Sequence, residues 1–123
     1  MDHAQTHAHA LAQQYLAAWN ERDTPARRAQ VARLFTLDAE YLDPTMRGAG
    51  HEGIDAMIAG AQQHFPGHRF ALAGTPDAHH DVLRFGWTLH GPDGLEVVRG
   101  LDVATVAPDG RLARVTGFLD MVA

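Results

Sequence analysis

The residue in this chain that most clearly points to chemistry is an aspartate inside a run that otherwise reads as a strand. Asp102 lies within residues 97–106, where apolar and β-branched residues dominate. A carboxylate in such a run faces water, meets a partner, or has its pKa raised by desolvation. Raised carboxyl pKa values are concentrated at sites of proton transfer, although structural ion pairs give the same pattern. Asp102 is therefore a candidate functional residue, and a structural pair with an arginine across the sheet is the alternative.

The residue inventory limits which chemistry is available. The sequence contains no cysteine, serine or lysine, and its ten basic residues are all arginine. These absences exclude serine and cysteine acyl-enzymes, lysine Schiff bases, thiolate metal sites and disulfides. Aspartate, glutamate, histidine and tyrosine remain, which leaves general acid/base catalysis, attack by a carboxylate, or a metal held by histidine and carboxylates.

Nine histidines raise the question of a metal site. His3 and His7 are one helical turn apart and could share an ion, and His79 and His80 lie near a predicted turn. We expect residues 1–10 to be a frayed and solvated extension. We therefore predict neither a metal site nor a cofactor.

Length and charge indicate one small domain that does not bind nucleic acid. The 123 residues suit a single core, with 46% hydrophobic and 20% charged residues. The formal net charge is −5, and the arginines are scattered rather than gathered in a stripe. The sequence has no apolar stretch long enough to span a membrane and no N-terminal signal pattern, so a cytoplasmic location is expected.

Hydrophobic periodicity predicts helices at the start of the chain. Apolar residues recur at helical spacing over 8–21 and place Tyr15 and Trp19 on one stripe. A second helix is predicted to begin with Thr24 as its N-cap and Pro25 at its first helical position.

The next segment predicts a short strand and a third helix. Residues 39–43 form the strand, which ends before Pro44, and a polar, glycine-rich loop covers 45–53. The third helix carries Met57 on its apolar side and stops at 65–67.

The second half of the chain predicts four strands joined by hairpin turns at 91–94 and 107–110. The predicted strands are residues 68–75, 82–90, 95–107 and 111–120. The resulting fold class is α+β, with a curved antiparallel sheet wrapped around three helices of the N-terminal half. Such a sheet forms a cone-shaped cup with an internal cavity.

Four short segments carry a resemblance to a known superfamily. They are Gln-Tyr-Leu-Ala-Ala-Trp-Asn at 14–20, Tyr-Leu-Asp-Pro at 41–44, Gly-Leu-Asp-Val at 100–103 and Asp-Gly-Arg-Leu at 109–112. With these segments in this order, the chain resembles the nuclear transport factor 2-like superfamily, which includes ketosteroid isomerases and SnoaL-like polyketide cyclases. The resemblance implies a single SnoaL-like domain over residues 11–123.

The resemblance to ketosteroid isomerases implies catalytic roles for three residues. Tyr15 matches the tyrosine of the oxyanion hole, Asp43 the general base, and Asp102 the protonated acid that gives the second hydrogen bond. In that chemistry an ionised carboxylate removes a proton beside a carbonyl while neutral donors stabilise the oxygen anion. The residues themselves leave other interpretations open, since Tyr15 also suits a core aromatic and Asp43 a strand-ending turn.

The cup implies a ligand cavity whose predicted contact residues are Trp19, Met57, Phe85, Trp87, Val115 and Leu119. Departures from the ketosteroid isomerase pattern indicate a ligand of another shape. Tyr41 is the only other tyrosine, and Ala61 lies roughly where a supporting residue is expected, which implies that the tyrosine network is lost or altered. Trp87 replaces a smaller residue, so a cavity too short for a steroid is expected.

The predicted function is binding of a small apolar, carbonyl-bearing ligand, with isomerase or cyclase chemistry as one hypothesis. The alternative is a non-catalytic ligand-binding or dimerisation module on the same fold. A third hypothesis, resembling limonene epoxide hydrolases, would use Arg99 with Asp102, but residues three apart on a strand face opposite sides. If Asp102 points inward, Leu101 and Val103 point outward, onto the sheet face that commonly forms dimers in this superfamily. A homodimer is therefore expected.

Overall fold

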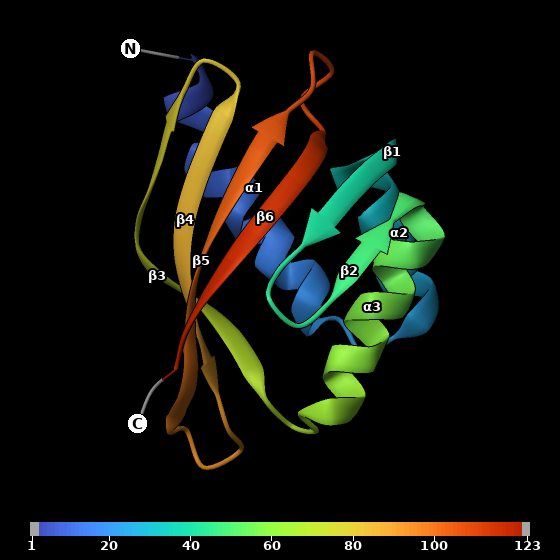
Figure 1. Ribbon diagram of the computed structural model, residues 1–123, viewed down its shortest axis with the longest axis vertical. Coiled ribbons are helices and arrows are strands. Elements are labelled where there is room, and N and C mark those ends of the chain that lie inside the picture. The colour runs from blue at the N-terminus through green and yellow to red at the C-terminus, as the bar shows by residue number, and fades with distance from the viewer. Residues whose placement is uncertain (1–2, 122–123) are drawn as a thin grey trace.

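The computed structural model describes residues 3–121 and contains three helices and a bent six-stranded sheet (Figure 1). The helices are α1 (His3–Asn20), α2 (Thr24–Leu34) and α3 (Gly50–His64). The strands are β1 (Phe35–Leu42), β2 (Arg47–Ala49), β3 (Arg69–His79), β4 (Val82–His90), β5 (Glu96–Val106) and β6 (Leu112–Met121). The predicted α+β class and the curved sheet are confirmed.

The sheet has the strand order β2-β1-β6-β5-β4-β3. β1 runs parallel to β6, whereas the other neighbouring pairs are antiparallel. The sheet is therefore mixed, whereas the sequence predicted an antiparallel sheet, and the difference lies in the parallel pair of β1 and β6. This junction joins two strands that are far apart in the chain, so no turn or local pattern in the sequence predicts it.

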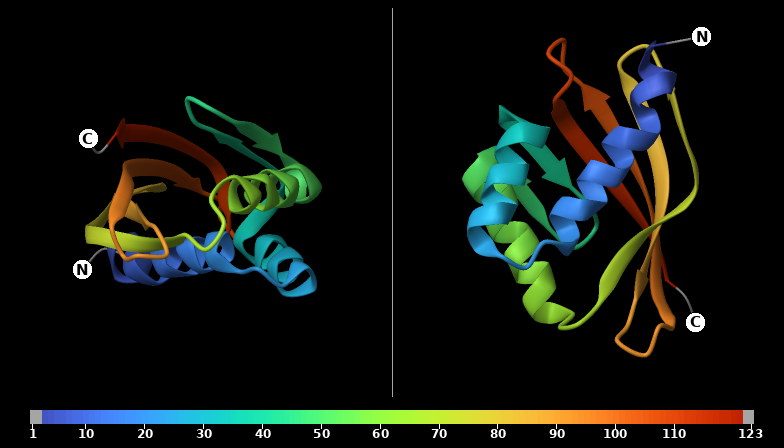
Figure 2. Two further views of the ribbon diagram at one scale, coloured as in Figure 1. Left: turned by 90° about the horizontal axis from the view of Figure 1, so that it is seen from below. Right: turned by 180° about the vertical axis from the view of Figure 1, so that it is seen from behind.

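The helices gather on the hollow side of the bent sheet. α1 packs along β3, and α3 packs against β1 and β2 (Figure 2). Because α1 and α3 lie over different strands, the inner surface of the middle of the sheet faces the space between them. The site described below occupies this region.

The apolar stripe predicted for the first helix is buried. Tyr15 and Trp19 are 1% and 5% exposed. α1 begins at His3, within the segment expected to be frayed, and Ala8 belongs to the core. The packing of Ala8 in the core stabilises this helical turn, which its polar neighbours would not stabilise by themselves. Residues 1 and 2 lie outside the described part of the chain.

Two aspartates stabilise α2, one as its N-cap and one through an ion pair from α3. The N-cap is Asp23 rather than Thr24, and its carboxylate accepts the Ala26 N–H at 3.0 Å. Further along, Arg27 Nε donates to Asp55 Oδ1 of α3 at 2.7 Å, and both side chains are buried. This buried pair anchors α3, whose other side faces the cavity.

Several element boundaries differ from the sequence prediction. The first strand starts at Phe35, the predicted loop over 45–53 contains β2 and the start of α3, and β3 continues to His79. Both predicted hairpin turns are present, at 91–94 and 107–110. Within residues 3–121, no helix is long and apolar enough to cross a membrane.

Candidate active site

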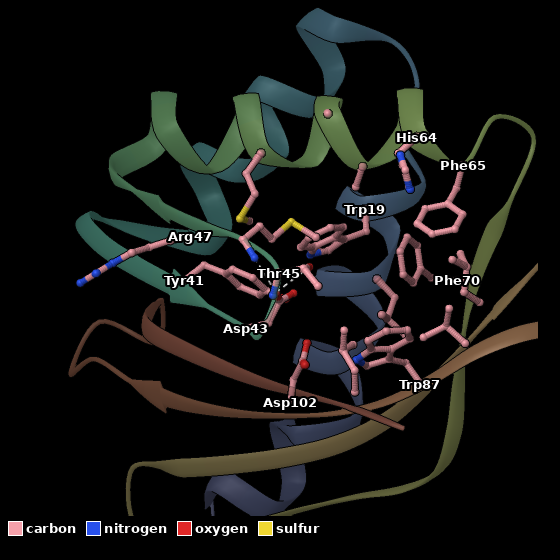
Figure 3. Close-up of a pocket in the computed structure, with 18 of the residues that line it drawn as sticks. Trp19, Tyr41, Asp43, Thr45, Arg47, His64, Phe65, Phe70, Trp87 and Asp102 are labelled. Carbon is pink, nitrogen blue, oxygen red and sulfur yellow. Dashed lines mark hydrogen bonds between the residues drawn. The ribbon is translucent and has the colours of Figure 1, made fainter. Parts of the chain in front are cut away.

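A cavity of about 700 Å³ lies between α1, α3 and the inner face of the sheet (Figure 3). Exposed lining residues mark its mouth, among them Arg47 and His64. Its deep end is lined by the fully buried side chains of Tyr15 and Asp102. The cavity therefore connects solvent with a buried ionisable group.

The lining matches most of the predicted contact residues. Four of the six line the cavity: Trp19, Met57, Trp87 and Leu119. Phe85 and Val115 are a correction, because both are buried in the core and neither is among the lining residues. α1 contacts β4 as well as β3 and covers part of the inner face of the sheet. The Phe85 ring packs edge-on against Tyr15, with ring centroids 5.1 Å apart.

Asp102 points from β5 into the deep end of the cavity (Figure 3). The residue is 2% exposed, and its Oδ1 atom has no hydrogen-bond partner in the described part of the chain. Burial and, to a smaller extent, the nearby charge of Asp43 raise the pKa of this carboxyl group, and hydrogen bonding by Trp87 and Tyr15 lowers it, so that it lies at about 6. No arginine pairs with Asp102 among residues 3–121, so the structural ion pair is not formed there.

Strand alternation separates Asp102 from Arg99. The Arg99 side chain is exposed and donates to Glu96 at 2.9 Å. Leu101 is also exposed, whereas Asp102 is buried. Arg99 and Asp102 therefore lie on opposite faces of β5, and the arrangement required for the epoxide hydrolase hypothesis is not assembled.

Two phenol groups lie close to Asp102. Burial, followed by the charge of Asp102, raises the pKa of Tyr15 well above its ordinary value. Burial likewise raises the pKa of Tyr41 on β1, whose hydroxyl donates to Asp43 Oδ2 at 2.6 Å. Both phenols stay protonated around neutral pH and remain hydrogen-bond donors. Sequence reasoning did not place Tyr41 in the site, because its position follows from the parallel pairing of β1 with β6.

Asp43 is held by four hydrogen bonds. Its Oδ1 atom accepts the Thr45 N–H at 2.8 Å, the Thr45 hydroxyl at 3.0 Å and the Met46 N–H at 2.9 Å. Its Oδ2 atom accepts the Tyr41 hydroxyl. Each carboxylate oxygen has about two lone pairs, so the three donors fully occupy Oδ1, whereas Oδ2 keeps one acceptor site beside the Tyr41 hydroxyl. Asp43 thus has the contacts of a turn-forming residue, and it also lines the cavity.

Gly117 lets the two carboxyl groups and Tyr41 approach one another. A Cβ atom on Gly117 would lie 2.8 Å from Asp102 Oδ1, 3.2 Å from Asp43 Cβ and 3.2 Å from the Tyr41 hydroxyl. Gly117 pairs with Asp102 across β5 and β6. Asp43 and Asp102 are therefore neighbours.

All three predicted catalytic residues lie in the part of the chain that matches a protein-family model. The model of the SnoaL-like domain matches residues 12–115. The chain belongs to the SnoaL-like domain family. Among curated proteins, none matches the sequence at a significant level.

Solved structures agree with this assignment. A SnoaL-like protein from Agrobacterium tumefaciens strain C58, named as a candidate isomerase, is 50% identical and has a TM-score of 0.92, covering 94% of this chain and 98% of its own. A candidate SnoaL-like polyketide cyclase from Jannaschia sp. CCS1 is 18% identical, with a TM-score of 0.79 and coverage of 98% and 90%. A candidate polyketide cyclase from Sinorhizobium meliloti is 21% identical, with a TM-score of 0.69 and coverage of 88% and 93%. The last two show the fold alone.

Four polar atoms at the deep end of this SnoaL-like cavity have no partner within the described protein. They are the Tyr15 hydroxyl, the indole nitrogens of Trp19 and Trp87, and Asp102 Oδ1. We call these four side chains the polar floor. Buried polar groups are normally paired, and an unpaired one costs about 1–3 kcal/mol. The Tyr15 hydroxyl and the Trp19 indole N–H are therefore complementary to a ligand oxygen atom that accepts hydrogen bonds.

The contacts of Asp43 predict how two of its variants differ in stability. Asp43→Asn keeps an oxygen for the Thr45 and Met46 N–H groups, so we expect a small change in the free energy of unfolding. Asp43→Ala leaves both N–H groups and Tyr41 unpaired, and we expect a loss of about 2 kcal/mol. Urea unfolding of the two variants measures this difference, and equal stability would contradict the structural role of Asp43.

Proposed function

We propose that this protein is an acid/base isomerase or cyclase that moves a proton beside a carbonyl group of a small apolar ligand. The observation that carries the proposal is the Asp102 carboxyl group, which is buried at the end of a cavity and has an unpartnered oxygen. Its pKa of about 6 is close to neutral pH, where a proton-transfer group works best. The 50% identity to a candidate SnoaL-like isomerase supports the same class of reaction.

In the proposed reaction, ionised Asp102 takes a proton from the carbon next to the carbonyl. The Tyr15 hydroxyl donates to the carbonyl oxygen as it becomes an enolate oxygen. For isomerisation, Asp102 returns the proton to another carbon of the conjugated system. For cyclisation, the enolate carbon bonds to a second carbonyl carbon, and the new alkoxide oxygen takes the proton from Asp102.

This proposal gives Asp43 a different role from the one implied by ketosteroid isomerases. Its four hydrogen bonds support a role in shaping the turn after β1 and in orienting the Tyr41 hydroxyl. Asp102 then carries the proton transfer. The apolar side chains around the polar floor support a ligand that is apolar apart from its oxygen atoms.

Deuterium exchange tests the proposed function without knowledge of the natural substrate. The protein is incubated in D₂O with a panel of cyclic enones and polyketide-like ketones, and loss of the proton signals beside the carbonyl is followed by NMR. Binding is followed separately by the fluorescence of Trp19 and Trp87, the only tryptophans of the chain. Catalysed exchange supports the proposal. Fluorescence changes without exchange across the panel contradict it and favour the non-catalytic binding module.

We also propose that two copies of the chain pair through the outer face of the sheet. Leu101 and Phe118 are opposite each other on β5 and β6 and are 37% and 56% exposed. Two adjacent apolar side chains on an open sheet face support burial against a second copy. We expect Phe118→Glu to convert a dimer into a monomer, and light scattering after size exclusion measures this. A wild-type protein that is monomeric at micromolar concentration contradicts the dimer.

A further inference from the structure

Trp87 and Asp102 project from neighbouring strands toward the same end of the cavity. In the pairing of β4 with β5, Trp87 is opposite Gly100, and Asp102 is two residues further along β5. Residues two apart on a strand share a face, so Asp102 is a diagonal neighbour of Trp87. Both side chains are buried and both line the cavity.

The indole ring of Trp87 packs directly against the backbone of Gly100. A Cβ atom on Gly100 would lie 2.2 Å from Cζ2, 2.4 Å from Cε2 and 2.8 Å from Cη2 of Trp87. These separations are too short for any residue with a side chain, so only glycine lets the ring rest on this strand. The close contact fixes the orientation of the ring, and Figure 3 shows its nitrogen turned toward Asp102.

We propose that Trp87, seated on Gly100, is a positioning residue for Asp102, whose ionised carboxylate accepts a hydrogen bond from the indole N–H. Nε1 of Trp87 and Oδ1 of Asp102 have no other partner among residues 3–121. One is a donor and the other an acceptor at the same end of the cavity. The inference rests on the proposed role of Asp102 in proton transfer.

Electrostatics support the same pairing. Burial raises the pKa of Asp102, whereas hydrogen bonding by Trp87 and, to a smaller extent, by Tyr15 lowers it. The titratable groups that face Asp102 are Tyr15 from α1, Tyr41 from β1 and Asp43 from the turn after β1. None of these carries a positive charge. Trp87 is therefore the stronger of the two donors that favour the ionised form of Asp102 despite its burial.

The first test compares two matched variants by NMR titration of protein labelled with ¹³C at the aspartate carboxyl groups. The Asp102 resonance is identified by its disappearance in Asp102→Asn. We expect Trp87→Phe to raise the titration midpoint by about one pH unit. Trp19→Phe removes the other indole N–H of the polar floor and is expected to leave the midpoint unchanged. An unchanged midpoint in Trp87→Phe, or an equal rise in both variants, overturns the proposal.

The second test uses the wild-type protein and does not depend on the folding of any variant. With ¹⁵N-labelled tryptophan, the indole N–H resonance of Trp87 is expected to shift with pH at the same midpoint as Asp102, and that of Trp19 is not. A Trp87 resonance that does not move between pH 4 and pH 8 overturns the proposal. Neither test requires turnover, so an absence of proton exchange would contradict the proposed function without deciding the role of Trp87.

Discussion

Asp102→Asn lowers the rate of proton exchange beside the ligand carbonyl by about 10³-fold, whereas Asp43→Asn lowers it far less. General acid/base groups contribute typically about 10²–10⁴-fold to a rate, and the asparagine amide at 102 cannot accept the proton. The amide at 43 keeps the oxygen that holds the turn after β1. The two substitutions make the same chemical change at neighbouring positions, so each is the control for the other.

The comparison requires that both variants still bind ligand. Tryptophan fluorescence measures binding in each variant, because Trp19 and Trp87 line the cavity. With binding intact, a larger loss of exchange in Asp43→Asn than in Asp102→Asn would restore the assignment implied by ketosteroid isomerases, with Asp43 as the base.

Asp102→Asn also stabilises the protein, and the gain depends on pH. Burial raises the pKa of Asp102 from 3.8 to about 6 in the folded state. Below about pH 3 the carboxyl group is mostly protonated in both the folded and the unfolded states and does not change the stability. As the pH rises toward 6 the unfolded state loses its proton first, so the wild-type protein loses stability. The pKa difference corresponds to about 3 kcal/mol above pH 6.

Urea unfolding between pH 4 and pH 8 measures this effect. The neutral amide of Asp102→Asn avoids the cost of burying a charge, so the variant is expected to be more stable at pH 7.5 by about 3 kcal/mol. The advantage is expected to shrink toward zero at pH 4. A variant that is less stable than the wild type at pH 7.5, or a difference that does not change with pH, contradicts the buried, ionisable state of Asp102. A stability cost of this kind is common where a residue serves function.

The sequence located the central residue of the site because local patterns sufficed for it. Asp102 interrupts an apolar strand, and once one side of β5 is buried, alternation decides that Arg99 and Leu101 face outward. The helical stripe of the first helix likewise brings Tyr15 and Trp19 to the core. These features depend on residues close together in the chain.

The partners of these residues depend on distant contacts that local patterns do not contain. The seat of Trp87 on Gly100 follows from the register between β4 and β5. The presence of Tyr41 at the site follows from the parallel pairing of β1 with β6. The hydrogen bonds that occupy Asp43 come partly from backbone N–H groups, which every sequence supplies and no composition reveals.

The start of α1 likewise depends on contacts that local patterns do not contain. Residues 3–10 are rich in histidine and alanine and form no strong apolar stripe of their own. The helix nevertheless extends over them, and Ala8 is buried in the core. Tertiary packing, rather than local preference, decides where α1 begins.

The pH dependence of deuterium exchange beside a ligand carbonyl tests the role of Asp102 most directly. After subtraction of the rate without protein, the exchange rate at saturating ligand is expected to rise with pH and to level off above a midpoint of about 6, the pKa of the buried Asp102 carboxyl group. The same profile is expected to be absent in Asp102→Asn. A midpoint near 4, as for an ordinary exposed carboxyl group, or a profile that survives in Asp102→Asn, would contradict Asp102 as the proton-transfer group.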